Sequence, residues 1–198
     1  MRVIAGSAGG VRLAVPKSGV RPTMDRVKAA IFSSLGELII GARVLDLFAG
    51  SGALGIEALS RGAASVIFVE DDRQSADAIE RNLANTKLKG CVRRQDVFHF
   101  LRQRSNAEKF EVVFADPPYE KGHPSKSDTE KLLNNENLPH LLGPKGIFVL
   151  EKQPGEPLGE TKLWRIIRKK RYGATEVLFL HQSAITNRQS TIHDSLSL

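Results

Sequence analysis

VLDLFAGSGALG occupies residues 44–55 and joins a short apolar run to a glycine-rich turn. Residues 44–48 predict a buried strand, and the apolar residues after Gly52 predict a helix that runs to about Ser60. Glycines adopt turn conformations that other residues resist, and they let a ligand come close to the backbone. In an open α/β sheet, ligands bind beyond the carboxyl ends of the strands, which makes this turn the first candidate binding site.

Asp46 distinguishes this turn from a dinucleotide-binding loop. Gly50, Gly52 and Gly55 partly match the pattern G-x-G-x-x-G, in which a helix start points at a pyrophosphate. A carboxylate that faces a pyrophosphate is repelled, whereas one that faces a sulfonium or an α-ammonium group is attracted. The pattern therefore favours S-adenosylmethionine over NAD as the cofactor. An ordinary glycine turn with a capping aspartate is the alternative interpretation.

Strands and helices alternate along the rest of the chain. The apolar patterns predict further strands at residues 65–70, 92–96, 111–116 and 146–151, helices at 23–38, 75–83, 97–104 and 129–142, and a closing pair of strands at 164–169 and 175–180. Thr23 is a plausible cap for the first of these helices. This alternation predicts an α/β fold with a mostly parallel sheet and helices on both faces.

Two more acids end the next two strands. Glu70 ends the second strand, where an acid can accept hydrogen bonds from both ribose hydroxyls. Asp96 ends the third strand, where it can accept from an adenine amino group while the Val97 N–H meets a ring nitrogen. A solvated Glu70 and a helix-capping Asp96 are the alternatives for each residue alone. The predicted cofactor-binding residues are Asp46, Phe48, Gly50, Gly52, Glu70, Asp96 and Val97.

The tetrapeptide Asp116-Pro117-Pro118-Tyr119 directly follows the fourth predicted strand. Its prolines fix the backbone and lack N–H groups, so the Asp116 carboxylate and the Pro117 carbonyl form a stiff pair of acceptors for a planar amino group. Tyr119 supplies a flat face for a flipped base, and such stacking contributes roughly 1–3 kcal/mol. We therefore predict Asp116, Pro117 and Tyr119 as catalytic residues that methylate an exocyclic base nitrogen by in-line displacement. A rigid turn with a chance tyrosine is the alternative.

The basic residues gather in two segments of this 198-residue chain, whose formal net charge is +7. Residues 1–43 hold seven basic and two acidic side chains, and residues 162–171 hold six basic side chains and no acid. Two such segments on one face of a fold attract a polyanion through counterion release. A surface with a general basic bias is the alternative interpretation.

The composition narrows the class of protein. Cys91 is the single cysteine, which excludes an intrachain disulfide, fits a cytoplasmic protein and disfavours a structural zinc site. The apolar runs are too short to cross a bilayer, so no membrane partner is expected. No metal is expected either. We expect residues 1–22 to form an N-terminal β-hairpin or arm, residues 23–182 to form one monomeric domain, and residues 183–198 to form a disordered tail.

Three segments together resemble the bacterial 16S rRNA guanine-N2 methyltransferases of the RsmD family. They are RPTMDRV at residues 21–27, DLFAGSGALGIEA at residues 46–58 and DPPY at residues 116–119. The glycine loop alone fits many methyltransferases, whereas the first segment joined to the last is far more specific. The resemblance extends over roughly residues 2–182, and the polar tail after them departs from the compact ending expected of the family.

The resemblance implies a Rossmann-like, seven-stranded class I methyltransferase that uses S-adenosylmethionine. It implies methylation of N2 of a guanine, guanine 966, in 16S rRNA within a 30S subunit or an assembly intermediate. It also implies that Arg21, Thr23 and Arg26 lie beside the site and contact RNA phosphate or the cofactor end, although a capped helix start with solvated arginines explains them as well. Arg168 and Lys169 of the second basic segment complete the predicted RNA contacts.

Two rival functions stay open at this point. A DNA adenine-N6 or cytosine-N4 methyltransferase uses the same chemistry, but it usually needs a target-recognition domain, for which 198 residues leave little room. A catalytically silent RNA-binding assembly factor on the same scaffold is the second rival. The intact acids and the intact tetrapeptide argue against it.

Overall fold

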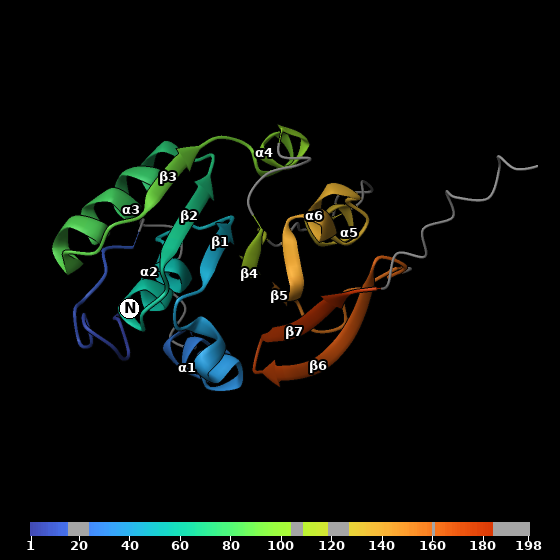
Figure 1. Cartoon of the computed structure of the whole chain (residues 1–198), viewed down its shortest axis with the longest axis horizontal. Coiled ribbons are helices and arrows are strands. Elements are labelled where there is room, and N and C mark those ends of the chain that lie inside the picture. Colours follow the sequence, from blue (N-terminus) through green and yellow to red (C-terminus); the bar gives the residue numbers. More distant parts are fainter. Residues whose placement is uncertain (16–23, 104–108, 119–126, 160, 184–198) are drawn as a thin grey trace, which may run out of the picture.

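A single twisted sheet organises the protein, as the computed structural model of residues 1–15, 24–103, 109–118, 127–159 and 161–183 shows (Figure 1). The strands follow the order β3-β2-β1-β4-β5-β7-β6. All neighbours are parallel except β7, which runs antiparallel between β5 and β6. The seven strands are β1 (Arg43–Leu47), β2 (Ser65–Glu70), β3 (Cys91–Arg94), β4 (Phe110–Ala115), β5 (Leu142–Lys152), β6 (Trp164–Tyr172) and β7 (Thr175–Gln182). The predicted α/β fold with a mostly parallel sheet is confirmed.

Helices cover both faces of the sheet because its strands are apolar on both sides. Val112 and Phe114 of β4 join one buried cluster, whereas Val113 and Ala115 join the other. The first cluster is closed by α1 (Met24–Leu35), α2 (Ala53–Ser60) and α3 (Arg73–Thr86). The second cluster is closed by α4 (Val97–Gln103), α5 (Asp128–Leu133) and α6 (Asn137–His140). This alternation within one strand is typical of a sheet that is buried between two helical layers.

Two predicted helices have different ends in the structure. The helix expected over residues 23–38 ends at Leu35, because Gly36 takes a positive φ of 55° and a short 3₁₀ turn (Gly36–Ile39) follows. The helix expected over residues 129–142 divides into α5 and α6. The Asn135 side chain accepts backbone N–H bonds at 3.0 and 3.1 Å from the start of α6, and this local capping opens a new helix.

The N-terminal arm, residues 1–15, folds back through one antiparallel bridge between Arg2 and Arg12, without two regular strands. It is anchored by Glu57 of α2, a fully buried side chain. The Glu57 carboxylate accepts two backbone N–H bonds from the arm at 2.7 and 3.1 Å and pairs with Lys28 of α1 at 3.2 Å. Because a buried charge is stable only when it is paired, these contacts fix the arm against the helix that follows the glycine turn.

The register of the central strands positions the candidate site. Asp46 of β1 lies opposite Phe68 of β2 and Phe114 of β4, so these parallel strands end at the same edge of the sheet. The turn after β1 and the tetrapeptide after β4 therefore emerge side by side. This edge is where an open α/β sheet binds its ligands.

Candidate active site

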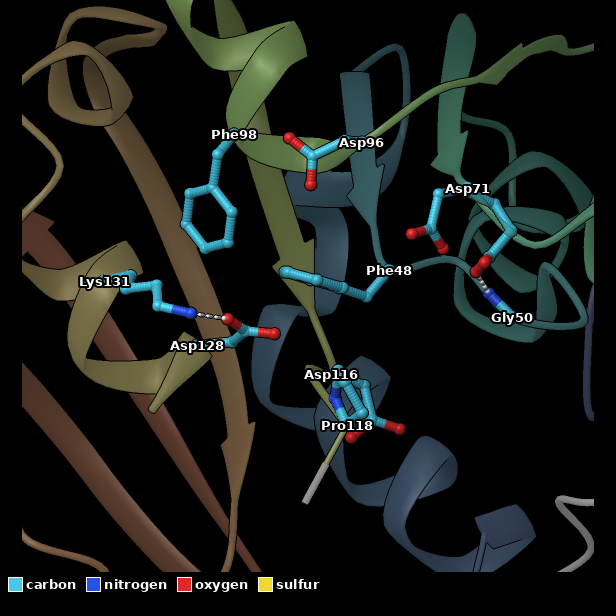
Figure 2. Close-up of a pocket in the computed structure, with 10 residues that line it drawn as sticks. Phe48, Gly50, Asp71, Asp96, Phe98, Asp116, Pro118, Asp128 and Lys131 are labelled. Atoms are coloured by element: carbon cyan, nitrogen blue, oxygen red, sulfur yellow. Dashed lines mark hydrogen bonds and ion pairs between the residues drawn. The ribbon is translucent and has the colours of Figure 1, made fainter. Parts of the chain in front are cut away.

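A pocket of about 430 Å³ opens at the carboxyl ends of β1, β2 and β4 (Figure 2). It brings together five of the predicted site residues, namely Phe48, Gly50, Glu70, Asp96 and Asp116. The remaining lining residues are Asp71, Phe98, Pro118, Asp128 and Lys131. Predicted cofactor-binding and catalytic residues therefore share one hollow, and its volume lies in the range of small-molecule sites.

The glycine loop, residues 49–52, is held by acidic side chains from two strands. Gly50 donates its N–H to Glu70 Oε2 at 2.7 Å, and Gly55 at the start of α2 donates its N–H to Asp46 Oδ2 at 2.9 Å. Gly50 and Gly52 have φ values of 55° and 75°, a region that favours glycine. The loop therefore has a defined shape that depends on both its glycines and its neighbouring acids.

Asp46 lies beneath the loop and not among the residues that line the pocket. Its side chain is only 2% exposed. Burial raises the pKa of Asp46 to about 8, the Gly55 N–H bond opposes this rise, and the nearby charges of Asp116 and Glu70 add to it. A cation bound close to this carboxyl favours its ionised form. Direct contact between Asp46 and a cofactor stays a prediction.

Glu70 reaches the pocket from the end of β2. Burial raises its pKa, and the N–H bonds from Asp72 and Gly50 oppose that rise. Its Oε1 accepts from the Asp72 N–H at 3.0 Å while Oε2 accepts from Gly50. Glu70 thus lines the pocket and also shapes the glycine loop. Its role as an acceptor for the ribose hydroxyls stays a prediction.

The charge of the pocket favours a cationic ligand. Five carboxyl-bearing residues and one lysine line it, and the carboxyl groups belong to Glu70, Asp71, Asp96, Asp116 and Asp128. A pyrophosphate would be repelled by such a lining, whereas a sulfonium or an ammonium group is attracted. The residues present therefore fit S-adenosylmethionine better than a dinucleotide, as the sequence predicted.

Phe48 crosses the middle of the pocket (Figure 2). It has a positive φ of 53°, which is uncommon for a bulky residue and costs on the order of 1–3 kcal/mol. Its ring meets that of Phe98 edge-on, with the centroids 6.1 Å apart and the planes at 67°. Such a strained conformation persists when the surrounding packing fixes it. Here the Phe48 ring lies between the two ends of the pocket.

Asp96 caps a helix and also lines the pocket. Its Oδ1 accepts from the His99 N–H at 2.7 Å and caps α4, while the same residue lines the pocket. Val97 follows as the first residue of α4 and is buried. Capping orients the Asp96 carboxylate, so it is compatible with the predicted contact to an adenine amino group.

The tetrapeptide begins where β4 ends. Asp116 is half-buried and lines the pocket, Pro117 is buried, and Pro118 is exposed at the pocket edge. Asp116 raises the pKa of Asp46 through its charge, which means that the ends of β1 and β4 lie within electrostatic reach of each other. Tyr119 lies outside the described residues, and its stacking role stays a prediction.

The three predicted RNA contacts that the structure describes are not among the residues that line the pocket. Arg26 is exposed on α1, and Arg168 and Lys169 are exposed on the edge strand β6. Lys169 pairs with Glu176 of β7 at 3.1 Å. Tyr172 at the end of β6 packs on the apolar cluster that contains α1, which brings the two basic segments toward each other. The other two predicted residues, Arg21 and Thr23, lie outside the described residues.

Five pocket residues are absent from the predicted set, although Pro118 belongs to the predicted tetrapeptide. Asp71 directly follows Glu70 and Phe98 lies two residues after Asp96, so predicted site residues stand close to both. Asp128 and Lys131 carried no such signal, because an acid and a lysine three residues apart on a helix usually form a solvated pair. Here they do pair, at 2.8 Å, and Lys131 also lies 5.7 Å from the centre of the Phe98 ring.

Comparisons with known proteins agree with this geometry. The model of the family described as conserved hypothetical protein 95 matches residues 1–181. Ribosomal RNA small subunit methyltransferase D of Haemophilus influenzae is 38% identical over 177 residues, which cover 87% of this chain and 89% of that protein. The Escherichia coli protein of the same name is 43% identical over 124 residues, 62% of each chain.

A solved structure shares the fold. The Thermus thermophilus 16S rRNA N2 G1207 methyltransferase, in complex with AdoMet and guanosine, superposes with a TM-score of 0.68 at 28% identity, covering 84% of this chain and 44% of that one. The predicted Rossmann-like class I methyltransferase fold is thereby confirmed. No helix in the described part of the chain is long and apolar enough to cross a membrane. The match over residues 1–181 and the two relatives show that the chain belongs to the RsmD family of ribosomal RNA small subunit methyltransferases.

Proposed function

We propose that the chain transfers the methyl group of S-adenosylmethionine to the exocyclic N2 of a guanine in 16S rRNA. As a member of the RsmD family it is an S-adenosylmethionine-dependent methyltransferase of ribosomal RNA. The observation that carries the finer proposal is the shared pocket, in which Gly50 and Glu70 face the same hollow as Asp116 and Pro118. A donor and an acceptor that react by in-line displacement need such a common space.

The cofactor half of the pocket is built from backbone and acids. Glu70 and Asp96 would hold the nucleoside, and the acidic surroundings of Asp46 would favour the positively charged end. When bound, S-adenosylmethionine supplies an electrophilic methyl group on a sulfonium. Phe48 and Phe98 provide the apolar walls that exclude water from the reacting atoms.

The acceptor half is built from the tetrapeptide. The Asp116 carboxylate and the Pro117 carbonyl would accept the two N–H bonds of a guanine amino group, which draws the nitrogen lone pair out of conjugation with the ring. Pro117 is buried at the end of β4, so this pair of acceptors has little freedom to move. The nitrogen is then the nucleophile, and no covalent enzyme intermediate forms.

The finer features of the substrate belong to the same proposal. The nucleotide is guanine 966, presented by a 30S subunit or an assembly intermediate to a monomeric, cytoplasmic enzyme. The relatives that are methyltransferases of small-subunit or 16S rRNA support RNA as the substrate, and the exposed cations of β6 support a phosphate-rich partner. Arg26 on α1 and Arg168 on β6 are the described residues that would contact it.

Mass spectrometry of 16S rRNA tests the proposal. RNA from cells that lack the gene should miss one methyl group on guanine 966, and plasmid-borne wild-type protein, but not Asp116→Ala, should restore it. Intact methylation in the deletion strain contradicts the proposed target. With labelled cofactor in vitro, transfer to DNA but not to undermethylated 30S particles favours the DNA methyltransferase. Failure to bind S-adenosylmethionine at millimolar concentration favours the silent assembly factor.

A further inference from the structure

Asn82 of α3 is a buried polar side chain that the mechanism has not used. It is only 1% exposed and contacts the glycine loop at the Ser51 carbonyl. A buried amide is stable only when its donors and its acceptor find partners. The partners of Asn82 come from two segments that are far apart in sequence, the N-terminal arm and the glycine loop.

The amide joins these segments through three hydrogen bonds. The Ala14 N–H donates to Asn82 Oδ1 at 2.8 Å, and Asn82 Nδ2 donates back to the Ala14 carbonyl at 2.9 Å. Nδ2 also donates to the Ser51 carbonyl at 2.9 Å. The reverse orientation of the amide would place its oxygen against two carbonyl oxygens, so the network has one arrangement.

The Ser51 contact controls one peptide plane of the loop. The Ser51 carbonyl and the Gly52 N–H belong to the same peptide unit, and the Gly52 N–H donates to the Ala49 carbonyl at 2.7 Å. The plane is therefore held at both its oxygen and its nitrogen. One turn earlier on α3, Ile79 leaves so little room that a Cβ at Gly52 would come within 3.2 Å of it.

We propose that Asn82 is a positioning residue that fixes the Ser51–Gly52 peptide for the cofactor and locks it to the N-terminal arm. The inference rests on the proposed function of this loop in binding S-adenosylmethionine. A loop that is ordered before the ligand arrives loses less conformational freedom on binding, which strengthens affinity. Because Asn82 is not among the residues that line the pocket, its effect acts through the loop backbone.

The inference separates cofactor binding from chemistry. Loss of the Asn82 amide leaves the buried Ser51 carbonyl without this donor, and only the Gly52 N–H bond to the Ala49 carbonyl then holds the peptide plane. Asp116 and Pro117 follow a different strand, β4, and should keep their positions. We therefore expect the KM for S-adenosylmethionine to rise roughly tenfold in Asn82→Ala, with kcat within about twofold of wild type.

Asn85 provides a matched control on the same helix. Its Nδ2 donates to the Arg12 carbonyl at 3.1 Å, so it holds the same arm without touching the loop. Asn85→Ala should leave the KM for S-adenosylmethionine within about twofold of wild type. Leu180→Ala, in the buried cluster on the other face of the sheet, controls for a general loss of stability.

Isothermal titration calorimetry with S-adenosylmethionine on the four full-length proteins is the test, and steady-state kinetics supply the split between KM and kcat. If Asn82→Ala fails to fold, Asn82→Asp replaces it, because it keeps the size and the acceptor for Ala14 but loses the donors to Ser51. The inference is supported when only the Asn82 variants bind weakly. It is overturned when Asn85→Ala or Leu180→Ala weakens binding as much as the Asn82 variants do. It is also overturned when the Asn82 variants bind S-adenosylmethionine as tightly as wild type. Wild-type protein that binds no S-adenosylmethionine instead contradicts the proposed function itself.

Discussion

The polar groups around the glycine loop are buried, whereas the charged groups of strand β6 are exposed. The loop contacts buried polar groups, with Asp46, Glu70 and Asn82 each under 10% exposed. In β6, by contrast, every residue between Trp164 and Tyr172 is exposed. A buried group acts on a ligand through direct hydrogen bonds, and its effect changes when pH changes its protonation. An exposed cation acts through a field that salt screens within about 8 Å at physiological ionic strength. The two regions should therefore differ in their response to pH and to salt.

The largest effect should come from the pocket, at Asp116. We expect Asp116→Ala to reduce methyl transfer by at least about 10²–10³-fold, because an acceptor aimed at the reacting amine is lost. Affinity for S-adenosylmethionine should stay within about threefold of wild type. Single-turnover rates and calorimetry measure the two quantities. Asp77→Ala, on the outer surface of α3, is the control, and undiminished turnover of Asp116→Ala refutes the assigned role.

Asp46 should make cofactor binding depend on pH. Its pKa of about 8 means that the carboxyl is largely protonated at neutral pH, and a nearby cation favours the ionised form. Affinity for S-adenosylmethionine should therefore rise with pH between about 6 and 8. Asp46→Asn keeps an acceptor for the Gly55 N–H but cannot ionise. We expect about 10- to 100-fold weaker binding at pH 8 and a flat pH profile, measured by titration calorimetry.

The same substitution should stabilise the protein without ligand. The pKa of Asp46 is higher in the folded chain than the value of about 3.9 in an unfolded chain, so the unfolded state loses this proton first. The free energy of unfolding therefore falls as pH rises from about 4 to 8. Asp46→Asn removes this loss and should be more stable at pH 8 by on the order of 3 kcal/mol, with little difference at pH 4. Equal denaturant midpoints at pH 8 would argue against a raised pKa.

Substitutions of Tyr119 test the predicted stacking of the target base. We expect Tyr119→Ala to lower kcat/KM for the RNA substrate by about tenfold, which corresponds to one lost base–aromatic contact. Tyr119→Phe should retain nearly full activity, since stacking requires the ring alone. The measurement is kcat/KM for undermethylated 30S particles. A phenylalanine variant as damaged as the alanine variant means that the hydroxyl group participates.

The smallest effects should come from β6, and they should depend on salt. Replacing Arg168 by alanine should weaken RNA binding severalfold and reduce the slope of log affinity against log salt by about 1. Lys169→Ala should change the slope less, because Glu176 already neutralises that ammonium at 3.1 Å. Filter binding over a salt series measures both slopes. An unchanged slope in Arg168→Ala removes β6 from the RNA interface.

The sequence predicts best what local patterns determine. The strand–turn–helix around Gly50 and the carboxylate after each strand follow from neighbouring residues, and the parallel sheet then gathers Glu70, Asp96 and Asp116 in one pocket. The same reasoning predicts that Asp46 faces the ligand. In the structure its Oδ2 accepts a hydrogen bond from the Gly55 N–H, and its contact with a ligand stays a prediction. Alternating apolar residues indicate a strand, but they do not tell whether its last acid faces the ligand or the loop.

What the sequence missed depends on tertiary packing. Lys131 of α5 lines the pocket beside Phe98 of α4, and no spacing within either helix signals that contact. The polar contacts of Asn82 with Ala14 cross 68 residues, and the amphipathic pattern of α3 indicates a buried face without saying that an amide in it joins the arm to the loop. Helix ends were missed for a third reason, since the Asn135 cap competes locally with continuation of α5.

A crystal structure of the protein with S-adenosylmethionine and guanosine tests most directly whether one pocket holds both donor and acceptor. The account predicts a sulfonium methyl carbon about 3–3.5 Å from guanine N2, between Gly50 and Asp116, with the Asp116 carboxylate on the amino group. A cofactor bound away from the glycine loop, or a guanine bound on the far side of Phe48 from Asp116, would contradict it.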